Sequence, residues 1–187
     1  FAEFNWQFEA GPIQCDAAGR RAWTGYPDRN LLMLFPYGSE GWTMSVAEGS
    51  RDPWRGWLPG PNGYLAAPQL TLTRAPMEET WFNFVTVLVP FEGGTPPSIR
   101  TAITEYAPTR RFWTLRLDWA DGTRDEVYWT HRLNYMLGTT SDFTTDGSLL
   151  HREGRMDGSW VRGAVANGTF IDPLSSRRLT EAGVIGF

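Results

Sequence analysis

The stretch Arg111-Phe-Trp-Thr-Leu-Arg-Leu-Asp-Trp-Ala-Asp-Gly-Thr-Arg-Asp-Glu-Val-Tyr-Trp129 identifies the fold class. Two segments rich in aromatic and β-branched residues flank Asp121-Gly122, a dipeptide that supplies the positive φ angles of a tight hairpin turn. The stretch therefore predicts a β-hairpin. Asp157-Gly158 and Asn167-Gly168 repeat the same turn chemistry, so residues 151–171 are expected to form a meander of short strands.

Other segments alternate apolar and polar residues with the period of a strand. The expected strands include 1–9, with Phe4, Trp6 and Phe8 on one face, and 41–46, 67–73 and 81–89, the last ended by Pro90; the apolar run 30–35 is expected to be buried on both faces. Helical spacing is confined to one short turn expected around Ser175–Leu179. The pattern predicts an all-β protein, an antiparallel β-sandwich with little or no helix. Because no linker-like segment divides the chain, residues 1–187 are expected to form a single domain.

Composition narrows the classes of partner. The 187 residues carry a net charge of −4, ten tryptophans and no lysine, so that all 17 basic residues are arginines. An acidic chain lacks the basic surface of a nucleic-acid binder. No apolar run approaches the ~20 residues that span a bilayer, so no membrane partner is expected. Cys15 is the one cysteine, which excludes an intrachain disulfide and a zinc site built from cysteines.

The segment from Arg51 to Tyr64 combines aromatic residues and arginines with a high density of glycine and proline, which predicts a long, shaped loop. Indole faces stack on the C–H groups of sugars, and arginine binds carboxylate or sulfate with two parallel hydrogen bonds. This chemistry makes the segment a candidate carbohydrate-binding site. Its alternative role is structural, with the tryptophans forming the loop's own small core. The candidate binding residues are Arg51, Trp54, Arg55, Trp57 and Tyr64.

No catalytic or metal site is predicted within the chain. His131, Arg132, Asn134 and Tyr135 are residue types that a polysaccharide lyase uses, but neighbours in a strand point to opposite faces. A paired-carboxylate glycosidase site drawn from distant strands stays open as a minor alternative. Turn propensity explains the acidic cluster Asp118, Asp121, Asp125 and Glu126, where a calcium site is conceivable although the spacing of an EF-hand is absent. No cofactor is expected.

The order of several short motifs resembles a known family. Gly56-Trp57 and Gly63-Tyr64 precede an Ala67-Pro-x-Leu70 strand, followed by Phe84-Val-Thr-Val-Leu-Val-Pro90; Leu32-x-x-Phe35-Pro36, Trp42-x-x-Ser45-Val46 and Trp119-Ala-Asp-Gly122 with Asp125 fit the same order. This arrangement resembles the C-terminal β-domain of the heparinase II/III-like polysaccharide lyases, including alginate-type exolyases. The resemblance covers roughly residues 30–130.

The resemblance implies that the chain is an accessory part of a lyase. In that family the catalytic Asn, His and Tyr, and a metal site where present, lie on a helical toroid and a central sheet that precede this region. No catalytic residue or metal ligand therefore carries over to this chain. Because the sequence begins at Phe1 without methionine, it is expected to be the C-terminal part of a longer chain. A periplasmic or extracellular location is favoured over a cytoplasmic one.

The function expected from the sequence is that of a C-terminal β-sandwich domain in a lyase that cleaves uronate-containing polysaccharide by β-elimination. Its expected partners are an acidic polysaccharide or oligosaccharide and the catalytic domains of the same parent enzyme. The domain would brace those catalytic domains and border the substrate cleft, without lyase activity of its own. Two alternatives stay open: a free-standing carbohydrate-binding module, and a small self-sufficient β-sandwich lyase or hydrolase.

Overall fold

The computed structural model is all-β: every element among the described residues is a strand, and the sheets are antiparallel. This confirms the predicted fold class. The described residues are 2–37, 41–74, 84–105, 112–130, 138–139, 144–145, 149–166, 169–171, 178–180 and 184–186. The chain divides into two compact units, Phe1–Pro97 and Ser98–Phe187, which are described separately. The expectation of a single domain stays a prediction.

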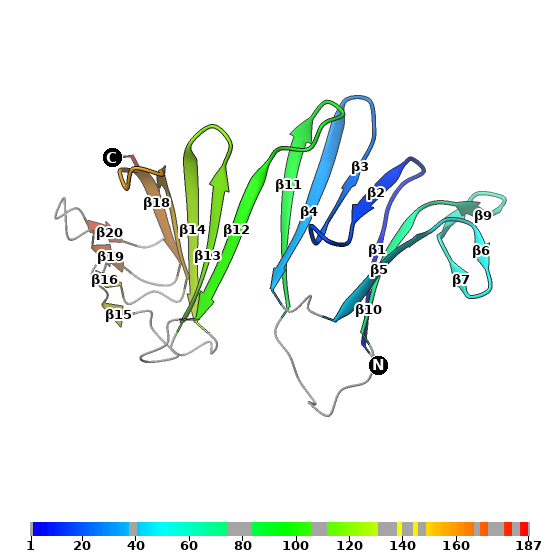
Figure 1. Ribbon diagram of the computed structural model, residues 1–187, viewed down its shortest axis with the longest axis horizontal. Coiled ribbons are helices and arrows are strands. Elements are labelled where there is room, and N and C mark those ends of the chain that lie inside the picture. The colour runs from blue at the N-terminus through cyan, green and yellow to red at the C-terminus, as the bar shows by residue number, and fades with distance from the viewer. Residues whose placement is uncertain are drawn as a thin grey trace. The chain divides into compact units, whose positions relative to one another are not determined.

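The N-terminal unit is built from two antiparallel sheets (Figure 1). One has three strands in the order β1-β10-β5, and the other has four in the order β11-β4-β3-β2. The strands of the first sheet are β1 Ala2–Gln7, β10 Gln69–Arg74 and β5 Trp42–Ala47. Those of the second are β11 Val85–Glu92, β4 Arg29–Tyr37, β3 Arg21–Thr24 and β2 Ile13–Asp16.

The core of this unit lies between the two sheets. Leu70 and Leu72 of β10 form one buried cluster with Met33 and Phe35 of β4. Phe4 packs against this cluster as the alternation in residues 1–9 predicts, together with other partly buried side chains: Trp6, Phe8, Leu31, Trp42, Met44 and Phe84. Side chains from both sheets thus share one apolar layer, which is the packing of a β-sandwich.

Strand β4 is buried on both faces, as its apolar run predicts: Leu32, Met33 and Phe35 have no exposed surface. Its neighbour β11 differs from the prediction, because it continues through Pro90 to Glu92. A proline lacks the backbone N–H, and β11 is an edge strand, where a missing donor leaves no partner unsatisfied. The first residues of the predicted strand, 81–83, lie outside the described residues.

The C-terminal unit contains a six-stranded sheet and a small four-stranded sheet (Figure 1). The larger sheet consists, in spatial order, of β12 Ile99–Glu105, β13 Phe112–Trp119, β14 Thr123–Thr130, β17 Leu149–Arg155, β18 Trp160–Ala166 and β21 Val184–Gly186. The smaller one consists of β15 Gly138–Thr139, β16 Thr144–Thr145, β19 Thr169–Ile171 and β20 Arg178–Thr180.

Two of the predicted Asp-Gly turns are present. Gly122 joins β13 to β14 with φ of +87°, and Gly158 joins β17 to β18 with φ of +92°. The Oδ1 atom of Asp121 accepts a hydrogen bond from the backbone N–H of Thr123 at 2.9 Å, which closes the first turn. The third dipeptide, at 167–168, lies outside the described residues. So do residues 175–177 of the expected helical turn, whereas 178 and 179 belong to strand β20, which contradicts that expectation.

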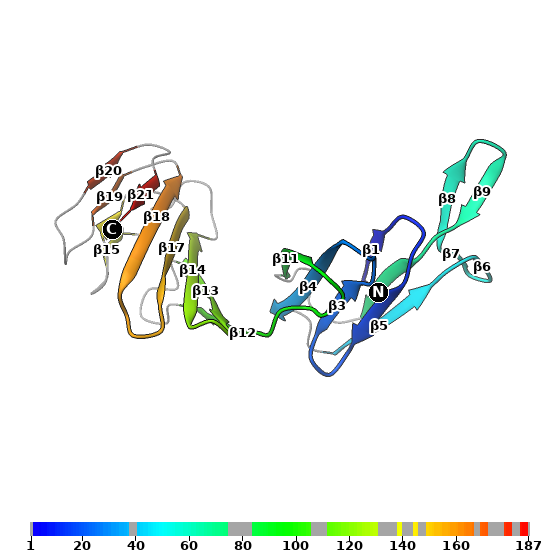
Figure 2. The ribbon, with the colours of Figure 1, turned by 90° about the horizontal axis from the view of Figure 1, so that it is seen from above.

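The segment predicted as a long loop forms two short hairpins instead. They are β6 Ser50–Arg51 with β7 Trp54–Arg55, and β8 Trp57–Gly60 with β9 Gly63–Ala66. Figure 2 shows both hairpins projecting from the end of the N-terminal unit. The predicted long loop is therefore wrong, because the glycines and prolines lie within and between two hairpins and do not prevent strand pairing. Pro53 follows a cis peptide bond in the β6–β7 turn.

Candidate functional site

Three of the predicted binding residues form one exposed aromatic cluster, defined here as Trp54, Trp57 and Tyr64. The indole rings of Trp54 and Trp57 are stacked, with centroids 5.0 Å apart and planes 17° apart. The ring of Tyr64 lies edge-on to Trp54 at 5.6 Å and 83°. Trp54 is 58% exposed and Tyr64 is 62% exposed, so the cluster presents aromatic surface to solvent.

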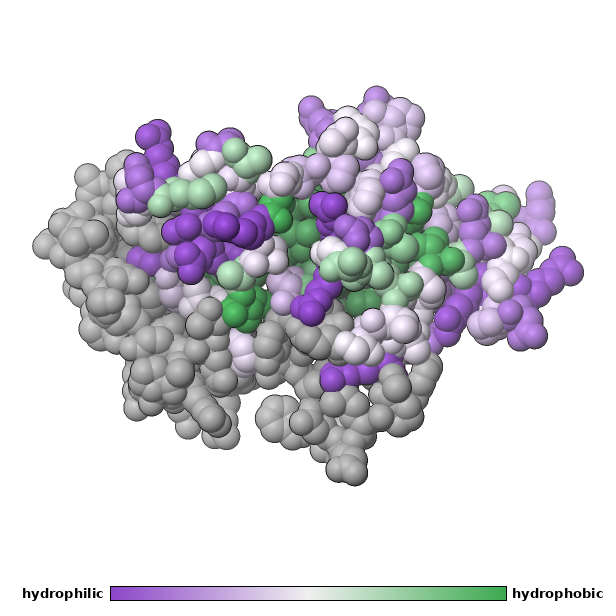
Figure 3. All heavy atoms as spheres, viewed as in Figure 1, coloured by the Kyte–Doolittle hydropathy of each residue, from purple (hydrophilic) through white to green (hydrophobic). Residues whose placement is uncertain are grey.

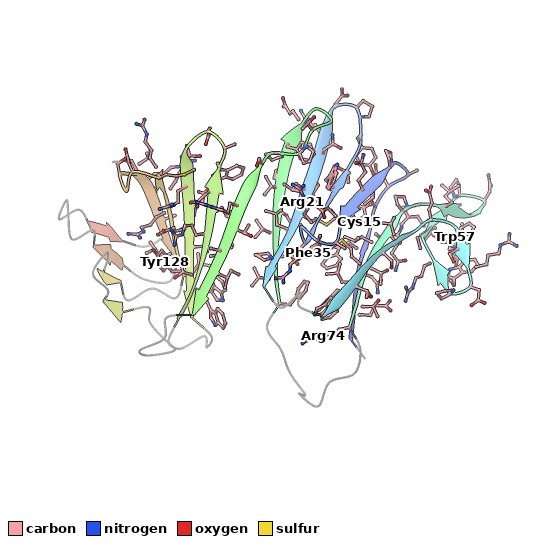
Figure 4. All side chains as sticks on the ribbon, in the orientation of Figure 1. Cys15, Arg21, Phe35, Trp57, Arg74 and Tyr128 are labelled. Atoms are coloured by element: carbon pink, nitrogen blue, oxygen red, sulfur yellow. The ribbon has the colours of Figure 1, made fainter. Side chains whose placement is uncertain are left out.

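The hairpin register brings these side chains together. Tyr64 is directly opposite Pro59, two residues from Trp57, and side chains two residues apart in a strand share a face. Trp57 and Tyr64 therefore lie on the same face of the β8–β9 hairpin. The indole Nε1–H of Trp57 donates to the carbonyl oxygen of Ser50 at 2.6 Å, which fixes the ring relative to β6. Figure 4 shows Trp57 on the projecting hairpins, apart from Phe35 in the core.

Gly56 connects the two hairpins and ties them to the sheet. Its carbonyl oxygen accepts hydrogen bonds from the backbone N–H groups of Gly49 at 2.8 Å and Ala67 at 2.9 Å. Its own N–H donates to the side-chain oxygen of Gln69 in β10 at 3.1 Å. With φ of +72° it occupies the left-handed region, and a Cβ there would lie 2.4 Å from the carbonyl oxygen of Ala47. This position therefore requires glycine.

The structure separates the two predicted arginines. Arg55 donates from Nη2 to the Glu3 carboxylate of β1 at 2.6 Å, and so anchors β7 to the sheet. Arg51 is exposed and directly opposite Trp54 in the β6–β7 register, and it makes no hydrogen bond or ion pair within the described chain. Opposite residues of an antiparallel pair lie on one face with Cβ atoms about 5 Å apart. Arg51 therefore belongs with the aromatic cluster, whereas Arg55 has a structural partner. That these residues bind carbohydrate stays a prediction.

The C-terminal sheet holds a charged network that turn propensity alone does not predict. The Oδ1 atom of Asp118 in β13 accepts a hydrogen bond from Arg124 of β14 at 2.6 Å, and its Oδ2 accepts one from Arg100 of β12 at 2.9 Å. These bonds, that from Arg124 foremost, outweigh the effect of burial and hold the pKa of Asp118 below its usual range. The turn at 121–122 fixes the pairing of 118 with 124, so this part of the network was accessible from the sequence.

A second set of buried polar groups lies on the same sheet face. Arg152 of β17 donates from Nη2 to the Oε2 atom of Glu126 at 2.9 Å and to the hydroxyl oxygen of Tyr128 at 2.6 Å. The Tyr128 hydroxyl in turn donates to the same Glu126 oxygen. Burial, joined by the neighbouring Glu126 carboxylate, raises the pKa of the Tyr128 hydroxyl well above its usual value despite the nearby Arg152. Tyr128 is therefore a hydrogen-bond donor at neutral pH.

A histidine–carboxylate pair lies on the opposite face of this sheet. Residues 125 and 151 differ by an odd number of positions from 128 and 152, respectively, and successive side chains in a strand alternate between faces. The Nε2 atom of His151 lies 2.8 Å from Oδ1 of Asp125, whose other oxygen accepts a hydrogen bond from the indole of Trp119 at 2.6 Å. Burial raises the pKa of Asp125, but these two hydrogen bonds outweigh it and leave the pKa lowered. His151 and Tyr128 thus do not converge on one point.

The remaining predictions about catalytic chemistry fall into two groups. His131, Arg132, Asn134 and Tyr135 lie outside the described residues. The carboxylates proposed for a calcium site have protein partners: Asp121 accepts hydrogen bonds from Thr123, and the other three belong to the networks above. Within the described ranges no group of three or more His, Cys, Asp or Glu side chains is arranged to hold a metal ion.

The chain was compared with protein-family models, curated proteins and solved structures, and none of them matches it. In the part of the chain that the structure describes, no helix is long and apolar enough to cross a membrane.

The Asp118 network makes a prediction about acid stability. Because the folded-state pKa is below the unfolded value of about 3.9, the Asp118 carboxylate stabilises the folded protein above that pH, and the contribution is lost as pH falls through the folded pKa. We expect Asp118→Asn to flatten the decline in unfolding free energy below about pH 4. Denaturant titrations at a series of pH values measure this slope. A slope unchanged from that of the parent chain would contradict the assignment.

Proposed function

We propose that this chain is the C-terminal β-sandwich part of a lyase that cleaves uronate-containing polysaccharide by β-elimination, and that it contacts the substrate through Arg51 and the aromatic cluster. The observation that carries the substrate contact is the exposure of Trp54, which is stacked on Trp57 where the two projecting hairpins meet. A small core formed only to support a loop would cover its rings, whereas Trp54 keeps 58% of its surface exposed. The motif order of residues 30–130, which resembles such lyases, supports the choice of substrate.

Arg51 is the side chain that would select an acidic sugar. Arg51 is directly opposite Trp54 in the register, and its guanidinium has no partner in the described chain. A pyranose ring stacked on the outer face of Trp54 would bring a carboxylate at C5 within reach of this fork. Arg55 is assigned a structural role instead, because its guanidinium is bonded to Glu3 at 2.6 Å and anchors β7 to the sheet.

The other face of the β8–β9 hairpin is where we propose contact with the catalytic domains of the parent enzyme. Leu58 and Leu65 are paired on that face, and Leu65 is 59% exposed. An apolar face opposite an aromatic one suits a hairpin that lies between a protein partner and a sugar. In this arrangement the chain positions substrate, and the elimination itself uses residues of the parent enzyme outside this chain.

Binding of a uronate oligosaccharide, followed by tryptophan fluorescence and calorimetry, tests the substrate contact. Trp54→Ala is expected to weaken binding about tenfold or more, because the stacking surface is lost. Arg51→Gln is expected to weaken uronate binding while leaving binding of a neutral oligosaccharide unchanged, and to reduce the dependence on salt concentration.

Two variants of the same unit serve as matched controls. Leu88→Ala removes another exposed apolar side chain, and Arg29→Gln removes another exposed arginine, both away from the hairpins. Neither should alter binding. If the parent chain binds no oligosaccharide, the sugar contact is wrong and the aromatic cluster belongs to a protein interface. Release of unsaturated uronate by the chain alone, seen in ultraviolet absorbance, would overturn the non-catalytic assignment.

A further inference from the structure

The charged face of the C-terminal sheet is organised as two parallel rungs of alternating charge. In the first rung Asp118 lies between Arg100 on β12 and Arg124 on β14, directly opposite each. In the second rung Glu126 lies in the same way between Arg116 on β13 and Arg152 on β17. Side chains directly opposite across a sheet lie on one face, so all of these groups share it.

The two rungs differ in how their carboxylates are used. Asp118 bonds both of its flanking arginines, Arg124 at 2.6 Å and Arg100 at 2.9 Å. Of the two arginines that flank Glu126, only Arg152 bonds it. The second hydrogen bond to its Oε2 atom comes from the hydroxyl of Tyr128. Tyr128 thus donates the second hydrogen bond to Glu126, which in the first rung comes from the second flanking arginine.

Arg116 is consequently a half-buried cation without a carboxylate: it makes no hydrogen bond or ion pair within the described chain. Arg100, its diagonal neighbour, is 79% exposed in its side chain and shares Asp118 with Arg124. The residue opposite Arg116 on β12 is Ala102. Its methyl group is too small to shield the guanidinium groups of Arg100 and Arg116 from solvent. Among the described residues of this face, four arginines against two carboxylates leave two excess positive charges.

We propose that Arg100 and Arg116 form an oxyanion-binding site for a carboxylate or a sulfate group. A guanidinium fork matches the two oxygens of either group, and a partly desolvated arginine gains more from such a partner than an exposed one. Figure 3 shows strongly hydrophilic residues at the surface of the C-terminal unit. Arg100 lies on the edge strand β12 with 79% of its side chain exposed, so an anion carried on a larger molecule can reach it. This site is distinct from the aromatic cluster and does not depend on the function proposed for it.

Titration with inorganic sulfate at low ionic strength, followed by NMR signals of the arginine Nε–H groups, tests the site. The signals of Arg100 and Arg116 are expected to shift saturably, and Arg116→Gln should weaken the response of Arg100 about tenfold or more. Arg116→Lys should give an intermediate loss of sulfate affinity, because lysine keeps the positive charge but lacks the planar guanidinium that forms two parallel hydrogen bonds. Arg155→Gln, which removes an exposed arginine at the end of β17, should change nothing.

Parallel titrations with a uronate oligosaccharide and a sulfated oligosaccharide identify the natural source of the anion, in a Trp54→Ala background that removes the contribution of the aromatic cluster. Tighter binding of either one than of inorganic sulfate supports the site and names its ligand class. Arg116→Gln is expected to unfold at the same temperature as the parent chain, since Arg116 has no partner within the described residues. The proposal is overturned if no probe shifts the Arg100 and Arg116 signals saturably, or if Arg116→Gln binds like the parent chain.

Discussion

Replacing Arg152 with leucine is expected to lower the unfolding free energy of the protein by about 3–5 kcal/mol, because it leaves a buried carboxylate without its cation. Arg152 is 3% exposed and donates hydrogen bonds to Glu126 at 2.9 Å and to Tyr128 at 2.6 Å. Its removal leaves the Glu126 charge with only the Tyr128 hydroxyl as donor. Chemical denaturation measures the loss, and hydrogen exchange in β14 and β17 shows whether it arises in the C-terminal unit.

A neighbouring ion pair in the same sheet provides the control. Arg162 of β18 pairs with Glu153 of β17, but its side chain is 57% exposed. Water already solvates such a pair, so Arg162→Leu should cost only about 0–1 kcal/mol. The double variant Arg152→Leu with Glu126→Leu removes both buried charges and should recover most of the stability, because an apolar pair can replace a buried ion pair at little cost. Equal losses for Arg152→Leu and Arg162→Leu would contradict the role assigned to burial.

The sequence was sufficient to predict the fold class, because local signals decide it. Alternation at Phe4 and Trp6, and the Asp-Gly turns at 121–122 and 157–158, depend only on neighbouring residues. The same turns also fix the register next to them, so that Asp118 facing Arg124 follows from the sequence once the hairpin is accepted.

The hairpins at 50–66 are not predictable from composition, because dense glycine and proline are equally typical of a loop. In a two-stranded hairpin each strand has a free edge, so Pro59 is tolerated within β8. The distinct roles of Arg51 and Arg55 were also beyond local inference. They depend on Glu3, which lies 52 residues from Arg55 and reaches it only because β1 pairs with β10.

The buried network at Glu126 could not be predicted for a related reason. Arg152 comes from β17, which pairs with β14 although residues 131–148 separate the two strands in the sequence. No pattern in the sequence specifies which strand fills that position. The separation of His151 from Tyr128 on opposite faces likewise follows only when the β14–β17 register is known.

Replacing Gly56 with alanine is expected to disrupt both hairpins and to abolish the aromatic cluster. The added Cβ would lie 2.4 Å from the carbonyl oxygen of Ala47 and 2.6 Å from the Cα atom of Glu48, both backbone atoms that cannot rotate away. The left-handed backbone adds its own cost for a residue with a side chain. Together these effects should cost about 2–5 kcal/mol. Circular dichroism of the stacked Trp54–Trp57 pair and binding of the uronate oligosaccharide report on the cluster.

Gly41 separates the two causes, because it has the same φ of +72° but nothing within 4 Å of its added Cβ. Gly41→Ala should therefore show only the cost of the left-handed backbone, about 1–2 kcal/mol, and keep the indole signal and the binding. The excess loss in Gly56→Ala then measures the close approach of backbone to backbone beside Ala47. If Gly56→Ala keeps the stacked-indole signal, the three hydrogen bonds of Gly56 are not what holds the cluster. If the signal is lost while oligosaccharide binding persists, Trp54 and Trp57 are not the sugar contact.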